Sequence, residues 1–431
     1  MSIIQIRINI LDFENNSVSS YLRRALNYSL DFTSRLTPII FFLSIPILTN
    51  AQINSLKEKG LNGRVRFVSE KFYKAEKDAD ELKKGQLLKE ESYTYDERGN
   101  LLESNEFDRN QKRIKSVFTY NENGRVKSHI TYNSQDEIVK KIIFKYDING
   151  NLINKKTYND NGDLVLSTNI NLDEYGNVIE QEITNSDGSS YLKFTSIYDT
   201  IGNLIKQNSY NADGSLRSEI TRKFDQGNLT EYIFLGKIDI KEEFNYDHKG
   251  NLIGKIMFSP IGSLNTIESY NYNTNQDLTE VNKYNADSSL NGKSVYHYDK
   301  DWNLTQKDSI IYKGDSFEKS IYFYDTNENL IKYYKYDSSD TLVKKLIISY
   351  DDMGNLTSRL SYSRDDVLEG KQTFKYDHKG NLISKRDYSK FDNSIFERYD
   401  YTYDDKDNVI KTVRFYKGTP YSLLLRDIQY Y

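Results

Sequence analysis

The chain has 431 residues, and its 63 acidic residues nearly cancel its 59 basic ones, so a net charge of −4 gives no electrostatic footprint for nucleic acid and no polybasic membrane patch. It contains no cysteine, which excludes thiolate metal sites, a cysteine nucleophile and a lipoprotein anchor on cysteine. Its 37 tyrosines and only 4 prolines are a strand composition, because tyrosine fits a pleated, half-wet surface and proline cannot donate to a sheet ladder.

The N-terminal segment is typical of a leader that ends in a secretory signal. Residues 39–48 form an apolar run that is too short to span a bilayer as a helix, and small residues follow it. We expect cleavage between Ala51 and Gln52, which leaves no transmembrane segment in the mature chain. Two explanations are open for residues 1–35: an unusually long basic region, or a true start near residue 36 with the preceding residues untranslated.

Residues 52–94 precede the repeats and are expected to form an N-terminal cap. Residues 63–73 resemble an opening strand, and the charged residues 75–84 are expected to form a short helix or a loop. An uncovered edge strand would pair with other chains, so we expect this segment to protect the first edge of the sheet.

From residue 95 to residue 431, a Tyr-Asp-x-x-Gly-Asn-Leu phrase returns at a spacing that is 26 residues in most units. Self-similarity at a fixed period marks a repeat architecture, in which each unit buries its apolar face against its neighbours. The array is therefore predicted to be one continuous body. The slot of the first aromatic residue falls at Tyr95, Tyr120, Tyr146, Leu172, Tyr198, Phe224, Tyr246, Tyr272, Tyr298, Tyr324, Tyr350, Tyr376 and Tyr403.

Each repeat unit is predicted to be a pair of strands with two turns. The turns open with Asp or Asn, whose side chain caps a backbone N–H group two residues on, and they carry Gly where a left-handed backbone is needed. The strands alternate with a period of 2, whereas a helix would need 3.6. In the unit that begins at Tyr146, the turn, strand, turn and strand are residues 147–151, 152–158, 159–163 and 164–172.

These units predict an all-β fold in which tandem hairpins form one long coiled antiparallel meander or a spiral shell. The Tyr at one strand end should pair with the Leu that opens the next strand. In the short unit that begins at Phe224, we expect a two-residue turn at 236–237 and a nine-residue strand at 238–246. The last strand, around residues 429–431, would leave an exposed edge through which two copies could associate.

Three of the phrases, at residues 146–153, 246–253 and 376–383, resemble the YD repeats of the RHS family. The resemblance covers residues 91–431 and lies in the period, the Tyr-Asp opening and the Gly that follows. It implies strands that spiral into a β-shell, and secreted or cell-surface proteins that bind carbohydrate or enclose a toxin. Because the repeats run almost to Tyr431, short repeat-only secreted forms without a toxin domain are the better comparison.

The sequence shows no set of residues for catalysis, and we expect no enzyme activity, cofactor or metal. Histidines 248 and 378 occupy the same turn slot in equivalent repeats, where a solvated residue is the simpler interpretation. Paired carboxylates such as those at 351–352 are turn residues without an apolar pocket. Alternating oxygens in residues 147–151 imitate the start of a calcium loop, but other repeats place Arg, Lys or Met there, which favours turn capping.

One candidate binding site breaks the repeat rule. In three successive units the turn Gly is replaced by Gln276, Trp302 and Glu328, and Trp302 is the only tryptophan. If equivalent turns line up, an indole lies between an amide and a carboxylate, which are the ingredients of a sugar-stacking site. The nearby tyrosines are Tyr333, Tyr334 and Tyr336. The alternative is a drifted turn whose indole packs on its neighbours.

Together these features predict a non-enzymatic, secreted, periplasmic or cell-envelope protein that serves as a binding or structural module, with a glycan or a protein as partner. The alternative is a cytosolic protein of the antitoxin or immunity type, because some of those families also use short Tyr/Gly strand repeats. Export with a mature start at Gln52 favours the first, and retention of residues 1–51 favours the second.

Overall fold

The computed structural model describes residues 56, 59–78, 81–107, 112–313, 316–389 and 391–431. The predicted cleavage site at Ala51 and Gln52 lies outside the described residues. The described residues form an all-β fold, as predicted, with 28 strands in a single antiparallel sheet.

The strands have the following bounds: β1 (Val65–Asp78), β2 (Glu81–Tyr95), β3 (Leu101–Phe107), β4 (Arg113–Tyr120), β5 (Val126–Tyr132), β6 (Ile138–Tyr146), β7 (Leu152–Tyr158), β8 (Leu164–Leu172), β9 (Val178–Asn185), β10 (Ser190–Tyr198), β11 (Leu204–Tyr210), β12 (Leu216–Asp225), β13 (Asn228–Leu235), β14 (Ile240–Tyr246), β15 (Leu252–Phe258), β16 (Leu264–Tyr272), β17 (Leu278–Asn285), β18 (Leu290–Tyr298), β19 (Leu304–Lys313), β20 (Ser316–Tyr324), β21 (Leu330–Tyr336), β22 (Leu342–Tyr350), β23 (Leu356–Tyr362), β24 (Leu368–Tyr376), β25 (Leu382–Tyr388), β26 (Ile395–Tyr403), β27 (Val409–Tyr416) and β28 (Thr419–Tyr430).

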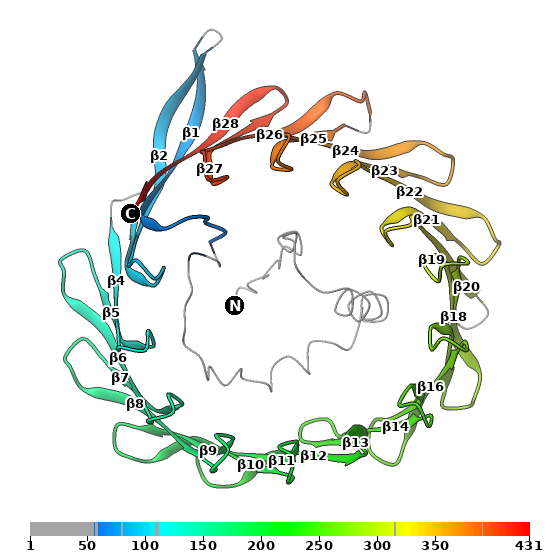
Figure 1. The fold of residues 1–431 in the computed structure, drawn as a ribbon, viewed down its shortest axis with the longest axis horizontal. Coiled ribbons are helices and arrows are strands. Elements are labelled where there is room, and N and C mark those ends of the chain that lie inside the picture. The colour runs from blue at the N-terminus through cyan, green and yellow to red at the C-terminus, as the bar shows by residue number, and fades with distance from the viewer. Residues whose placement is uncertain (1–55, 57–58, 79–80, 108–111, 314–315, 390) are drawn as a thin grey trace. The chain divides into compact units, whose positions relative to one another are not determined.

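The sheet is a meander that closes on itself. Each strand pairs with the next one in the chain, and β1 also pairs antiparallel with β28, with Val65 opposite Tyr430 and Phe67 opposite Gln429. Figure 1 shows the strands in chain order around a ring. The prediction of a free edge around residues 429–431 is therefore wrong, because the first strand occupies that edge.

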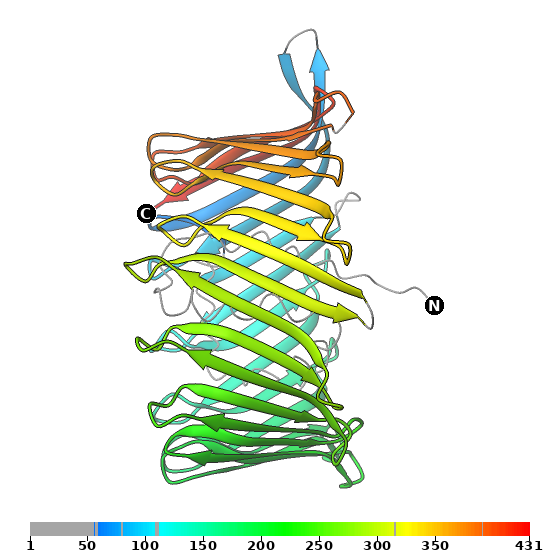
Figure 2. The same cartoon turned by 90° about the vertical axis from the view of Figure 1, so that its right-hand side faces the viewer.

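The segment before the repeats belongs to the same sheet. Residues 75–84, expected to form a helix or a loop, instead end β1 and begin β2, so that expectation is wrong. Pairing of β1 with β28 stops at Lys74, and pairing of β2 with β3 begins only at Glu90, so the hairpin extends beyond both neighbours (Figure 2). At the base of this ribbon Ala75 is buried against Val413 and Leu423, and charged residues suit the positions beside it that meet solvent.

The turn chemistry of the repeat is visible in the loop between β6 and β7. Oδ1 of Asp147 accepts a hydrogen bond from the backbone N–H of Asn151 at 2.7 Å, and the Asn151 amide donates to Oδ2 of Asp147 at 3.0 Å. One Asp–Asn pair thus closes the loop from both sides. Tyr146 lies opposite Leu152 beside this turn, which confirms the predicted pairing of strand ends.

The short unit differs from its predicted layout. Strand β14 has seven residues where nine were expected, and the turn before it comprises residues 236–239, not two residues. The cause is Asp239, whose Oδ1 accepts a hydrogen bond from the backbone N–H of Gly236 at 3.0 Å and draws two more residues into the turn.

The tyrosine that ends most of the nine-residue strands has a structural role that phenylalanine could not fill. The hydroxyl of Tyr146 donates to the carbonyl of Val126 at 2.8 Å, and that of Tyr376 donates to the carbonyl of Leu356 at 2.9 Å. Val126 lies beyond the ladder between β5 and β6, which begins at Ser128, so its carbonyl has no backbone partner on β6. The tyrosine hydroxyl supplies the missing donor.

We expect Tyr146→Phe to lower the free energy of unfolding by about 1 kcal/mol, because a part-buried carbonyl loses its donor. The matched control is Phe224→Tyr, which adds a hydroxyl in a unit that lacks one and should raise stability. Urea unfolding followed by circular dichroism measures both. Equal effects of the same sign would contradict this role.

The main buried apolar cluster lies where the sheet closes. It combines Leu61, Val65 and Val68 with residues of β2 to β5, and Ile428 and Tyr430 of the last strand pack against it. Beside it, Arg426 on β28 forms an ion pair with Glu70 on β1 at 2.7 Å. The closing pair of strands is therefore held by packing and charge together, and we call this junction the seam.

Candidate functional site

Alternate turns of a meander lie at the same end of the sheet. We call the Tyr-Asp rim the end that carries the turns after β2, β4 and each following even-numbered strand up to β26, and in Figure 1 these turns form the inner circle of hooks. Gln276, Trp302 and Glu328 lie on three consecutive turns of this rim. Neighbouring turns are two strands apart, or about 10 Å. These three residues on consecutive turns are called the Trp302 row below.

The backbone of the Trp302 row has the conformation that the repeat reserves for glycine. The φ angles are 71° at Gln276, 65° at Trp302 and 61° at Glu328. The turn is nevertheless closed in the usual way, because the Trp302 N–H donates to the carbonyl of Asp299 at 3.1 Å. Large side chains are therefore held at left-handed positions, which costs about 1 kcal/mol or more for each residue.

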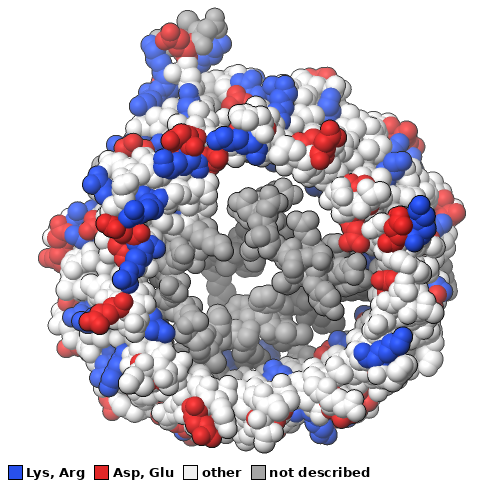
Figure 3. Space-filling view, viewed as in Figure 1, with Lys and Arg blue, Asp and Glu red and all other residues white. Residues whose placement is uncertain are grey.

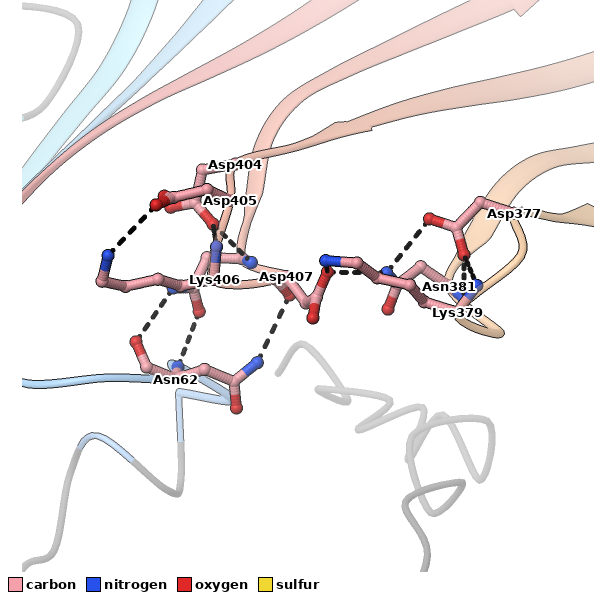
Figure 4. A network of polar contacts seen from close by, with 9 residues as sticks. Asn62, Asp377, Lys379, Asn381, Asp404, Asp405, Lys406 and Asp407 are labelled. Atoms are coloured by element: carbon pink, nitrogen blue, oxygen red, sulfur yellow. Dashed lines mark hydrogen bonds and ion pairs between the residues drawn. The ribbon is translucent and has the colours of Figure 1, made fainter.

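Asp407 is another residue that replaces the turn glycine on this rim, and its side chain forms stabilising contacts. It also occupies a glycine slot with a positive φ of 63°, and sequence reasoning missed it although the slot is readable in the turn at 404–408. Its carboxylate forms an ion pair with Lys379 at 2.7 Å and accepts a hydrogen bond from the Asn381 amide at 3.1 Å (Figure 4). These contacts join two neighbouring turns and offset the strain.

The same network ties the rim to the segment before β1. The backbone N–H of Asn62 donates to Oδ1 of Asn408 at 2.6 Å, and the Asn408 amide donates to the Asn62 carbonyl at 2.9 Å. Asn408 is almost completely buried by these contacts. The side chains of the Trp302 row form no comparable hydrogen bond or ion pair with any residue that the structure describes.

Trp302 is 45% exposed, so a large part of the indole is accessible on the rim. Its turn is anchored by Asp299, whose Oδ1 accepts from the backbone N–H groups of Asp301 and Asn303 at 2.9 Å. The hydrogen bond from the Asn303 N–H holds the pKa of Asp299 below its usual value, so the carboxylate stays charged near neutral pH. The indole is thus carried on a fixed turn, and the two neighbouring turns of the rim carry an amide and a carboxylate.

The three tyrosines proposed with this row lie elsewhere. Tyr333 and Tyr334 are in the middle of β21, where their rings contact Tyr322 and Phe323 with centroids 5.0 and 5.7 Å apart. Tyr336 ends β21 at the opposite rim, where the Lys319 ammonium lies 5.3 Å from its ring centroid. The structure therefore places Gln276, Trp302 and Glu328 on consecutive turns of one rim and leaves the tyrosines in the wall.

No group of three or more His, Cys, Asp or Glu side chains that could hold a metal ion occurs among the described residues. No helix within the described ranges is long and apolar enough to cross a membrane.

Comparisons with known proteins gave structural similarities only, since no protein-family model and no curated protein matches this chain. The crystal structure of TcdB2-TccC3 without its hypervariable C-terminal region is 11% identical over 76% of this chain, with a TM-score of 0.29. The Photorhabdus luminescens Tc holotoxin pore is 12% identical over 80%, with a TM-score of 0.27. This chain spans 25% and 22% of those two chains.

A porin-like protein from Bacteroides uniformis is also similar, at 9% identity over 85% of this chain and 98% of that protein, with a TM-score of 0.22. TM-scores of this size assign neither a shared fold nor a shared function.

Proposed function

We propose that this protein is a non-enzymatic module of the cell envelope or the extracellular space, and that the Trp302 row binds a glycan. The closed sheet supplies a stiff scaffold, since every strand has two hydrogen-bonded neighbours. Ligand-contacting groups on such a scaffold belong on loops, and the Trp302 row lies on three rim turns whose usual glycine is replaced. A secreted location rests on the predicted cleavage before Gln52.

The observation that carries the proposal is the strained and accessible Trp302. Packing does not explain the side chain, because it is 45% exposed, and the backbone favours glycine at its φ of 65°. Aromatic faces stack on sugar rings, and amide and carboxylate groups such as Gln276 and Glu328 hydrogen-bond sugar hydroxyls. A binding role gives a reason for the strain that folding does not.

The test uses the fact that the chain has a single tryptophan. Titration with a panel of neutral and acidic oligosaccharides should change the emission of Trp302 for at least one of them. Gln276→Gly and Glu328→Gly restore the usual turn residue and keep the reporter, and each should weaken that sugar about tenfold by removing a hydrogen bond. Ile201→Ala, on a distant turn of the same rim, should leave the affinity unchanged.

Trp302→Gly separates binding from folding in the same experiment. It should abolish sugar binding in calorimetry while raising the free energy of unfolding by about 1 kcal/mol, because strain is removed. If Trp302→Gly binds every sugar as the parent does, the proposed site is wrong. If it destabilises the fold, the indole is a packing residue.

A further inference from the structure

A second surface on the Tyr-Asp rim combines apolar turn residues with lysines. Three consecutive turns carry large apolar side chains at their tips: Ile148 is 99% exposed, Tyr175 81% and Ile201 75%. These turns follow β6, β8 and β10, so adjacent tips are about 10 Å apart. Along the arc of β8 to β11, the end of the ring seen in Figure 3 is mostly white. Folding alone gives no reason to expose three such residues side by side.

The wall next to these tips is basic although the chain as a whole is acidic. Residues 112–156, which cover β4 to β6 and most of β7, contain ten Lys or Arg and four Asp or Glu, against a net charge of −4 for the chain. On β6, residues 141, 143 and 145 share a face, and Ile143 lies opposite Lys156 on β7. Lys141, Lys145 and Lys156 therefore cluster on one face of two paired strands.

These lysines differ from several others in the wall. Lys206 pairs with Glu219 on the adjacent strand at 2.8 Å, and Lys293 pairs with Glu280 at 2.6 Å. Lys141, Lys145 and Lys156 form no ion pair with any residue in the described ranges. Two strands away on the same face, β9 carries Glu180, which is paired with Lys193 at 2.6 Å, and Glu182, which lies opposite Lys193. The charge of β6 and β7 is thus left for an external anion.

From this juxtaposition we propose that the surface formed by Lys141, Lys145 and Lys156 with Ile148, Tyr175 and Ile201 docks the protein on an anionic lipid membrane. The apolar tips enter the boundary between headgroups and acyl chains, and the lysines contact lipid phosphates. A soluble polyanion would need the lysines but not the tips, so the exposed tips favour a lipid surface. The site lies several turns away from Trp302, and the proposal does not depend on sugar binding.

The test is sedimentation of the full chain with vesicles of phosphatidylcholine alone or with 30 mol% phosphatidylglycerol, a fraction of about one anionic lipid in three. We expect binding only to the anionic vesicles and a decline with added salt. Changing Ile148, Tyr175 and Ile201 together to Ser should weaken binding about tenfold or more, because the tips no longer insert. Lys145→Gln with Lys156→Gln should have an effect of similar size.

Matched controls exist in the repeats. Met353 has the same turn slot as Ile201, and Lys375 has the same strand slot as Lys145, so Met353→Ser and Lys375→Gln should leave vesicle binding unchanged. Circular dichroism confirms that each variant is folded. Equal binding to both vesicle types, or full binding by the triple Ser variant, would overturn the proposal. The proposal would also be overturned if the protein bound no vesicles but bound soluble dextran sulfate, and if the lysine changes weakened that binding.

Discussion

Replacing Glu70 with Ala is expected to lower the free energy of unfolding by about 3–5 kcal/mol, because it leaves the Arg426 guanidinium without a carboxylate partner in a largely dry site. The two side chains are only 7% and 16% exposed, and Arg426 also donates from Nε to Glu70 at 2.8 Å. The pair joins β1 to β28, which no turn connects. The change therefore acts on the one junction that the chain does not hold covalently.

The matched control is Glu219→Ala, which removes the partner of Lys206 between β11 and β12. That pair is more exposed and its strands are joined by a turn, so the loss should be about 0–1 kcal/mol. Urea unfolding measures both variants, and size-exclusion chromatography should show association of Glu70→Ala as strand edges open. Similar losses of unfolding free energy for the two variants would mean that the ion pair at the seam stabilises the fold no more than an exposed ion pair elsewhere in the sheet.

Acidification is expected to destabilise the whole ring. Hydrogen bonds from the backbone N–H groups of Asn303, Asn355 and Asn381 hold the pKa values of Asp299, Asp351 and Asp377 below the usual 3.8. A carboxyl group whose pKa is lower in the folded chain stabilises the fold above its unfolded pKa, and this contribution is lost as the pH falls through the folded value. Because the turn recurs around the rim, many small losses add up.

The urea midpoint should therefore stay level from about pH 7 to about pH 5 and fall steeply below about pH 4. Asparagine caps provide the control, because Asn273 already fills this slot and its Oδ1 accepts from the Asp277 N–H at 2.9 Å. Changing Asp299, Asp351 and Asp377 together to Asn should make the decline shallower. An unchanged acid profile would show that other groups are responsible.

Strand bounds could be predicted because local turn chemistry determines them. The predicted strands at 152–158 and 164–172 agree with β7 and β8 residue for residue, since an Asp–Asn pair or a glycine fixes each end. Closure could not be predicted in this way. Glu70 and Arg426 are 356 residues apart in the chain, and nothing in the repeat of either strand specifies that they should meet.

For the candidate site, too, the local backbone could be predicted from the sequence, whereas the positions of residues relative to one another could not. The left-handed backbone at Trp302 follows from its glycine slot, because the slot demands that geometry whatever residue fills it. The positions of Tyr333 and Tyr336 were misjudged because neighbours in sequence separate along a strand by about 3.3 Å for each residue. The lysine cluster on β6 and β7 was not predicted, because the net charge of −4 is a sum over the whole chain and does not reveal a local excess of basic residues.

The closed meander also limits how such a gene can change in length. Neighbouring strands run in opposite directions, and β1 meets β28 antiparallel, so the number of strands must be even. Each repeat unit adds two strands, and duplication or deletion of a whole unit therefore preserves the junction while changing the circumference by about 10 Å. Loss of half a unit would bring two strands of the same direction together. Evolution of the ring is thus expected to proceed in whole repeats, and rings of different circumference can share one closing pair.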